Sequence, residues 1–179
     1  MIKKEAITGY KNLEIDIYQD IGLEQKKELW FKSCLNNLNW ETGFIKIFGK
    51  THQIPRLQAW YAEDGIEYTY SGKKLQRHNW NETLIDIKEE IESITSFKFN
   101  SVLANLYRNG DDSMGLHSDD EKELGINPVI ASLALGKSRD IHFKHKNIKT
   151  SLDIPQTNGQ LIVMYGQTQK YWKHEIKKT

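Results

Sequence analysis

The sequence has little cysteine, almost no net charge and no long apolar run, and each scarcity excludes a class of protein. Cys34 is the only cysteine among 179 residues. This excludes an internal disulfide framework and a cysteine-rich zinc site, and it fits a reducing compartment. The net charge is +1, so any surface for nucleic acid has to be local. No apolar run approaches membrane-spanning length, and the N-terminus lacks the apolar core of a signal peptide.

We therefore expect a soluble intracellular protein with no membrane partner, nuclear in a eukaryote or cytoplasmic in a bacterium. Hydrophobic residues make up 38% of the chain and charged residues 27%, which is a globular composition. The length suits one domain with a real core. We expect a monomer.

Two helices and a series of short strands are predicted from the apolar periodicity. Residues 23–38 carry apolar side chains at helical spacing, from Trp30 to Leu38. Asn81 is placed to cap a second helix, in which apolar residues recur from Leu84 to Ile94. Afterwards the pattern turns to period two, with strands expected at 102–107, 114–119, 129–135, 139–144, 151–154 and 160–165. This order predicts an α+β chain whose second half is a β-sandwich or jelly roll, buttressed by the N-terminal helices.

His117 and Asp119 stand two residues apart. On an extended backbone both side chains lie on one face. They form two thirds of a facial triad of two histidines and one carboxylate, which holds iron(II) and leaves coordination positions open. His174 is the best candidate for the third ligand, since it is the only histidine beyond His145. The alternative is that the short H-x-D pattern arises by chance, with both groups solvated on a loop.

The segment before the second predicted helix has aromatic residues at two positions, a strand tip and a strand face. Phe48 precedes Gly49 and Lys50 at a strand tip; it either folds back onto the core or is a wedge that enters stacked bases. Tyr68 and Tyr70 share a strand face, as half of a core or as a stacking platform. The nearby positive charges either form a solvated face or meet phosphates; they are Lys50, Lys73, Lys74 and Arg77.

The chain resembles the AlkB family in an ordered series of motifs. They are Asn105-x-Tyr107, His117-Ser118-Asp119-Asp120-Glu121, Pro128 to Leu133, Gly136-x-x-Arg139-Asp140, Gly159 to Met164 and Trp172-x-His174. AlkB enzymes are iron(II)- and 2-oxoglutarate-dependent dioxygenases that reverse alkylation damage in nucleic acids. The upstream motifs resemble the branch that repairs duplex DNA; they are Phe48-Gly49-Lys50, Pro55-Arg56-x-Gln58-Ala59 and Tyr68 to Gly72. The resemblance covers roughly residues 44 to 174.

The resemblance implies a role for each matching residue. It makes His117, Asp119 and His174 the iron ligands and Asn105 and Tyr107 the contacts of 2-oxoglutarate. The residues implied to bind substrate are Phe48, Gly49 and Lys50 as a finger that enters the duplex, Tyr68, Thr69 and Tyr70 as the wall of the base pocket, Asp120 as a substrate-contacting acid, and Arg56 in the same lid. The implied fold is a double-stranded β-helix. Its expected parts are an arm and helix at 1–42, a nucleotide-recognition lid at 43–80 and the jelly-roll core at 81–179.

The implied activity is direct-reversal repair of N-alkylated bases such as 1-methyladenine and 3-methylcytosine in double-stranded DNA. The implied reaction requires Fe(II) as cofactor, consumes 2-oxoglutarate and O2, and releases formaldehyde, succinate and CO2. A flipped base is required, because the methyl group lies on an edge hidden inside the duplex. The alternatives are an RNA demethylase, a protein hydroxylase of the same superfamily and an inactive nucleic-acid-binding form.

The sequence departs from the family pattern after His174. The pattern continues with an R-x(5)-R segment on a final strand, whose first arginine pairs with the remote carboxylate of 2-oxoglutarate. The sequence given ends at Thr179. On this pattern we expect that the final strand of the jelly roll is missing. We also expect that the chain binds 2-oxoglutarate weakly and turns over slowly.

Overall fold

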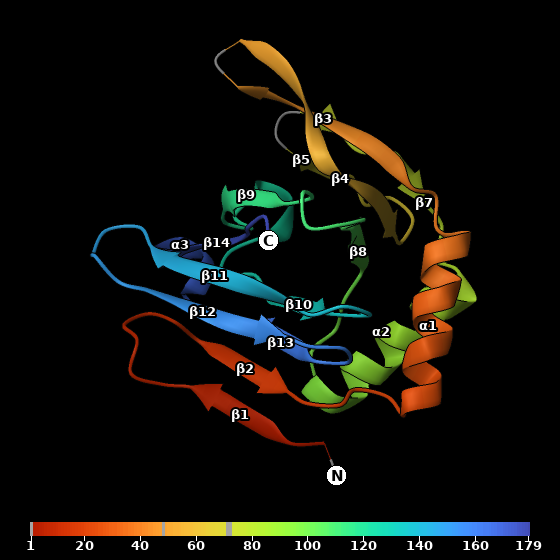
Figure 1. Cartoon of the computed structure of the whole chain (residues 1–179), viewed down its shortest axis with the longest axis horizontal. Coiled ribbons are helices and arrows are strands. Elements are labelled where there is room, and N and C mark those ends of the chain that lie inside the picture. The colour runs from red at the N-terminus through yellow and green to blue at the C-terminus, as the bar shows by residue number, and fades with distance from the viewer. Residues whose placement is uncertain (1, 48, 71–72) are drawn as a thin grey trace. The chain divides into compact units, whose positions relative to one another are not determined.

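The computed structural model describes residues 2–47, 49–70 and 73–179 (Figure 1). The described chain forms two compact units. The first is made of Met1–Lys32 and Gly115–Lys177, and the second of Ser33–Met114 and Lys178–Thr179. In sequence, the second unit is inserted between the two halves of the first. These boundaries differ from the predicted segments 1–42, 43–80 and 81–179.

The first unit contains two four-stranded sheets (Figure 1). One sheet has the order β1 (Lys4–Ile7), β2 (Ile15–Tyr18), β13 (Leu161–Met164) and β10 (Ile130–Leu133). The other has the order β12 (Ser151–Gln156), β11 (Arg139–His145), β14 (Trp172–Ile176) and β9 (Met114–His117). The short helices η1 (Lys122–Leu124) and α3 (Thr168–Tyr171) connect strands.

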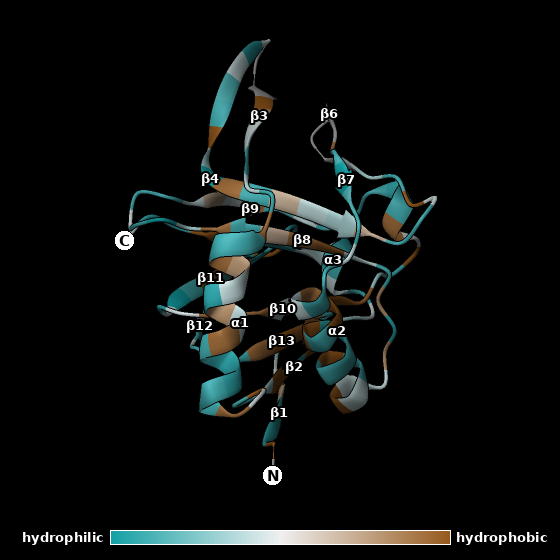
Figure 2. Ribbon diagram, turned by 90° about the vertical axis from the view of Figure 1, so that its right-hand side faces the viewer, coloured by the Kyte–Doolittle hydropathy of each residue, from teal (hydrophilic) through white to brown (hydrophobic). Residues whose placement is uncertain are grey.

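The core of the first unit lies between these two sheets. Ile17 of β2 and Ile162 of β13 belong to the same buried cluster as Phe143 of β11 and Trp172 of β14. Fully burying an apolar side chain of this size contributes about 1.5–3 kcal/mol. Strand β13 is apolar throughout, as Figure 2 shows, whereas β2 alternates Ile15 and Ile17 with Asp16 and Tyr18. Two antiparallel sheets that share one apolar core form the sandwich that the period-two pattern predicted.

The second unit is a sheet covered on one face by a helix. The strands β3 (Glu41–Ile47), β4 (Lys50–Ala62) and β7 (Arg77–His78) lie in that order, and β8 (Ser101–Leu106) also pairs with β4. Ala59 and Tyr61 of β4 pack with Leu84 of α2 (Glu82–Thr95). The strands β5 (Thr69–Tyr70) and β6 (Lys73–Lys74) form a separate small hairpin. Helix α1 (Glu24–Asn37) begins in the first unit and ends in the second.

Both predicted helices are present, and the predicted N-cap is confirmed. The side chain of Asn81 accepts a hydrogen bond from the Leu84 N–H at 2.9 Å, which satisfies one of the free donors of the first turn of α2. In α1, Trp30 is buried, whereas Phe31 and Leu35 are 36% and 40% exposed. The apolar pattern of α1 therefore overestimated how much of the helix is covered.

Two strands differ from the prediction. The strand expected at 114–119 ends at His117 as β9, so Asp119 lies beyond it. Strand β14 (Trp172–Ile176) was not among the predicted strands, yet it pairs with β11 and carries His174. In the described part of the chain, the helices are too short and too polar to cross a membrane.

Candidate functional site

Three predicted ligands meet inside the first unit. Asp119 places one carboxylate oxygen 3.6 Å from Nε2 of His117 and the other 3.4 Å from Nε2 of His174. One ligand atom from each residue lies within 4.8 Å of the other two. The two imidazole rings are 4.3 Å apart between centroids. The side chains are only 12% to 17% exposed. Residues 57 positions apart in the sequence therefore converge on one small volume.

The backbone fixes which nitrogen of His117 is available. Nδ1 lies 2.8 Å from the carbonyl oxygen of Gly115, which can only accept. Nδ1 therefore carries an N–H, and Nε2 is the nitrogen that faces Asp119. A ring nitrogen that donates to a carbonyl in this way orients the other nitrogen for metal binding.

The protonation states also suit a cation. Burial, with the neighbouring His117, lowers the pKa of His174 to about 4, so its imidazole is neutral at pH 7. Burial acts to raise the pKa of Asp119, but the hydrogen bond from His117 and the charges of His174 and His117 outweigh it, and the pKa lies below its usual value. Two imidazoles and one carboxylate are the donor set of a facial triad, so these residues fit a divalent iron.

Asp119 is held in place by contacts that the sequence did not indicate. Its backbone N–H donates to Oε1 of Gln169 at 2.9 Å. The hydroxyl of Ser118 donates to the carbonyl oxygen of Trp172 at 2.8 Å. These two bonds tie the segment after β9 to the segment before His174. His117 on β9 and His174 on β14 lie on neighbouring strands of one sheet. Asp119 lies just beyond β9, where these two hydrogen bonds hold it, and its side chain meets that of His117 as the H-x-D spacing predicted.

Asp120, the predicted substrate-contacting acid, points its carboxylate toward solvent beside a lysine. Nζ of Lys146 lies 3.2 Å from Oδ2 of Asp120 and 2.8 Å from the carbonyl oxygen of Gln169. The Asp120 side chain is 61% exposed, and that of Lys146 is 22% exposed. Lys146 thus links the acid to the same segment that holds Asp119.

The residues implied for 2-oxoglutarate lie in the second unit. Asn105 accepts a hydrogen bond at Oδ1 from Nε of Arg56 at 2.8 Å, and its Nδ2 donates to the carbonyl oxygen of Leu103 at 3.4 Å. The hydroxyl of Tyr107 lies 3.7 Å from the sulfur of Met114. Arg56 is 3% exposed. The guanidinium of Arg56, which was expected in the lid as a substrate contact, is therefore buried and bound to Asn105.

The predicted lid residues are described only in part. Phe48, Ser71 and Gly72 lie outside the described residues, as does the side chain of Tyr70. Gly49 adopts φ +78° between β3 and β4, a conformation that glycine reaches without strain, and Lys50 is exposed beside it. Thr69 is exposed, whereas Tyr68 is 8% exposed with its ring 5.9 Å from that of Trp60. Tyr68 therefore packs in the core, one of the two alternatives left open for it.

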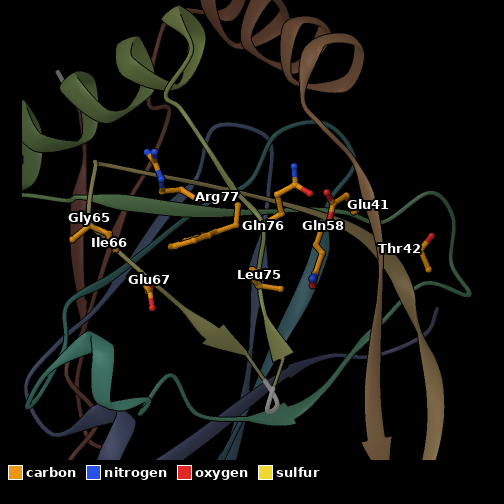
Figure 3. Close-up of a pocket in the computed structure, with 10 residues that line it drawn as sticks. Glu41, Thr42, Gln58, Gly65, Ile66, Glu67, Leu75, Gln76 and Arg77 are labelled. Atoms are coloured by element: carbon orange, nitrogen blue, oxygen red, sulfur yellow. The ribbon is translucent and has the colours of Figure 1, made fainter.

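The second unit also has an open cavity of about 650 Å³ that contains none of the predicted site residues (Figure 3). Gly65, Ile66 and Glu67 line one side, Glu41 and Thr42 the other, and Gln58 and Gln76 lie between them. Arg77 at its edge is already paired with Asp64 at 2.8 Å. The aromatic ring of Trp60 is 4% exposed, so it offers little surface to a ligand.

Comparisons with known proteins agree with the metal centre. The sequence pattern described as the 2OG-Fe(II) oxygenase superfamily matches residues 15–179. Human DNA oxidative demethylase ALKBH2 is 36% identical over 140 residues, covering 74% of this chain and 54% of that protein. Human alpha-ketoglutarate-dependent dioxygenase alkB homolog 3 is 41% identical over 138 residues, covering 72% and 48%. The chain spans about half the length of these curated relatives.

A solved structure, titled "The structure of OsALKBH1", superposes with a TM-score of 0.63 and 14% identity, covering 95% of this chain and 87% of that chain. At this identity the likeness concerns the fold alone. Together with the two antiparallel sheets of the first unit, it confirms the predicted jelly-roll class.

Proposed function

Because the chain belongs to the 2OG-Fe(II) oxygenase superfamily and, within it, to the AlkB family, we propose that it is a dioxygenase that oxidatively removes alkyl groups from nucleic-acid bases. The observation that carries the proposal is the convergence of one ligand atom each from His117, Asp119 and His174 within 4.8 Å. The lowered pKa values of Asp119 and His174 also suit a divalent metal. The co-substrates are 2-oxoglutarate and O2.

The reaction has a simple balance. One oxygen atom of O2 is inserted into a C–H bond of the N-methyl group, and the other enters succinate as 2-oxoglutarate loses CO2. The N-hydroxymethyl product then breaks its N–C bond, which releases formaldehyde and returns the proton to the base nitrogen. Bound iron supplies the activation of O2, which no protein side chain provides. His117, Asp119 and His174 would hold the iron, and three protein ligands would leave coordination positions open for co-substrate and oxygen.

The finer part of the proposal is that the substrate is double-stranded DNA with 1-methyladenine or 3-methylcytosine. Two features support it: the resemblance in sequence of residues 48–50 to the finger, and of Thr69 and Tyr70 to the wall, of the duplex branch, and a relative named as a DNA oxidative demethylase. Tyr68, the third residue of that wall motif, packs against Trp60. An alkylated base pairs badly, so flipping it costs less than flipping a normal base. Filling the gap with Phe48 offsets part of the remaining cost of unstacking.

An RNA demethylase is the second candidate. The names of the relatives are compatible with it, because the relative at 41% identity is named without a polymer, whereas the one at 36% is named as a DNA demethylase. A protein hydroxylase has no use for the aromatic and basic residues of 48–50 and 68–74, so it is disfavoured.

The experiment presents one sequence, with a single 1-methyladenine, as duplex DNA, single-stranded DNA and RNA. Loss of the methyl group is followed by mass spectrometry, and formaldehyde and succinate are quantified. We expect equal yields of both products and the fastest reaction on duplex DNA, with no reaction by Asp119→Ala. A faster reaction on RNA than on duplex DNA would make RNA the preferred substrate. Binding of the methylated oligonucleotides without release of formaldehyde would contradict the proposal that the protein is a demethylase.

The finger is tested separately with Phe48→Ala. We expect a selective loss on duplex DNA, because only there does a gap have to be filled. Phe44→Ala is the matched control, since Phe44 is an aromatic residue of the same hairpin and 46% exposed. Equal losses of activity on duplex and single-stranded DNA would mean that Phe48 contributes to folding rather than to duplex recognition. Binding should also weaken as salt rises if Lys50 meets phosphate.

A further inference from the structure

Gln169 is a deeply buried polar residue beside the metal centre. It lies in α3, is 2% exposed, and its Oε1 accepts the hydrogen bond from the Asp119 N–H at 2.9 Å. Its Nε2 lies 3.5 Å from the sulfur of Met164, a weak acceptor. Burying an uncharged amide is costly unless it is hydrogen-bonded, so the bond to the Asp119 N–H offsets part of the cost of burying Gln169.

The position of Gln169 is itself fixed by the first unit. The hydroxyl of the preceding residue, Thr168, accepts from the N–H of Glu14 at 2.9 Å and donates to the carbonyl oxygen of Glu14 at 3.1 Å. Thr168 is 1% exposed. The carbonyl oxygen of Gln169 accepts from Nζ of Lys146 at 2.8 Å. A buried chain of hydrogen bonds therefore runs from the segment before β2, through α3, to the backbone of Asp119.

Asp119 needs such support because it lies beyond the end of β9. A residue within a strand is held by backbone hydrogen bonds to the neighbouring strand, whereas Asp119 lies outside the strand. Its carboxylate must nevertheless keep one oxygen toward each histidine, at 3.6 Å and 3.4 Å. A hydrogen bond to its own N–H restricts the backbone rotations that would swing the carboxylate away.

The chemical nature of residue 169 matters as well. Its contact atom must accept, because the partner is an N–H. A carboxylate would also accept, but it would bring a second negative charge beside Asp119 in a buried place and favour protonation of that ligand. Glutamine is the neutral side chain whose acceptor reaches this far.

We propose that Gln169 is a positioning residue for the metal centre: its amide oxygen holds the backbone of Asp119 so that the carboxylate faces His117 and His174. It touches neither substrate nor co-substrate. The inference rests on the metal site of the proposed function, but it concerns how the ligand set is kept ready rather than what is oxidised.

The test is Gln169→Met, which keeps the volume and removes the acceptor. Co(II) is titrated into the metal-free full chain, and the visible absorption bands report both affinity and ligand geometry. Removal of groups that orient metal ligands typically weakens affinity about 10–100-fold, and we expect a loss in this range together with a changed Co(II) spectrum. Affinity within about twofold of the wild type, with an unchanged spectrum, overturns the inference.

Gln156→Met is the matched control, because Gln156 is also buried, at 6% exposed, in the first unit, and it bonds Ser132 rather than a metal ligand. We expect it to lower the melting temperature as Gln169→Met does, but to leave Co(II) affinity and spectrum unchanged. Equal loss of affinity in both variants means that Gln169 acts only through general stability, and the inference fails. If the wild type itself binds no Co(II), the proposed function fails first.

A measurement on the wild type remains decisive if Gln169→Met does not fold. Hydrogen exchange of the Asp119 amide, followed by NMR, reports its hydrogen bond directly. We expect slow exchange, because the amide is paired with a buried acceptor. Exchange at the rate of a free loop amide contradicts the inference.

Discussion

Nε of Arg56 donates to Oδ1 of Asn105 across 2.8 Å, between neighbouring strands of the second unit. Because Nδ2 of Asn105 donates to the carbonyl oxygen of Leu103, the amide of Asn105 is held at both ends. This contact gives Arg56 a different role from the one expected of a charged residue in a lid. The guanidinium of Arg56 is buried inside the unit, where its hydrogen bond orients Asn105, a residue implied to contact 2-oxoglutarate.

Arg56→Lys should therefore weaken 2-oxoglutarate binding. Lysine keeps the charge but cannot donate from the Nε position, and a hydrogen bond to a charged group contributes about 1.5–3 kcal/mol, so we expect roughly a tenfold or greater loss of affinity. Isothermal titration calorimetry with metal-loaded protein measures it. Arg77→Lys is the control, since Arg77 pairs with Asp64 at the surface. Equal affinity of Arg56→Lys and wild type contradicts the role of this bond.

Asp119→Ala should abolish measurable metal binding under conditions in which the wild type is saturated. The change removes the only carboxylate of the triad, and losing a ligand should cost more than the roughly 10–100-fold typical of an orienting partner. Mn(II) titration followed by electron paramagnetic resonance gives the affinity. Asp140→Ala, at an exposed acid of β11, should bind as the wild type does. Unchanged affinity of Asp119→Ala removes this residue from the site.

The stability of the metal-free protein should fall as the pH drops from about 6.5 toward 4. His174 has its pKa lowered to about 4 by burial, so over this range the unfolded chain binds a proton that the folded chain does not. Each pH unit then costs at most about 1.4 kcal/mol of unfolding free energy. Asp119, whose pKa is lowered, adds no loss until below its own usual value.

Urea unfolding of wild type and His174→Asn at several pH values, with a chelator present, isolates this contribution. We expect the difference in unfolding free energy between the two proteins to shrink as the pH falls. A difference that stays constant from pH 7 to pH 4.5 means that His174 titrates normally in the folded state.

Asn81→Ala should destabilise the protein by about 1 kcal/mol, because the first turn of α2 loses the acceptor for the Leu84 N–H. Asn81→Asp keeps an acceptor and adds a favourable charge at the helix N-terminus, so it should match or exceed the wild type. The urea midpoint at constant slope measures both. If the two variants are equally destabilised, the cap is not the cause.

Local signals in the sequence were sufficient for the elements that depend on neighbours in the chain. Asn81 and the apolar spacing of α2 are of this kind. The alternation of Trp172, His174 and Ile176 with Lys173 and Glu175 is also local and indicates β14 in retrospect. Gln169 and Arg56 are different, because their hydrogen bonds reach residues 50 and 49 positions away. The neighbours of a polar residue in the sequence do not predict that it will be buried and hydrogen-bonded to a residue far along the chain.

The interleaving of the two units has a consequence for biosynthesis. Strand β2 pairs with β13, which leaves the ribosome about 140 residues later, a wait of roughly 7–30 s at ordinary translation rates. During that time β2 can pair only with β1, and Ile15 and Ile17 lack the facing sheet of their core, while almost all of the second unit has already been synthesised. The nascent chain should therefore need chaperone cover on its first strands and acquire protease resistance first in residues 33–114.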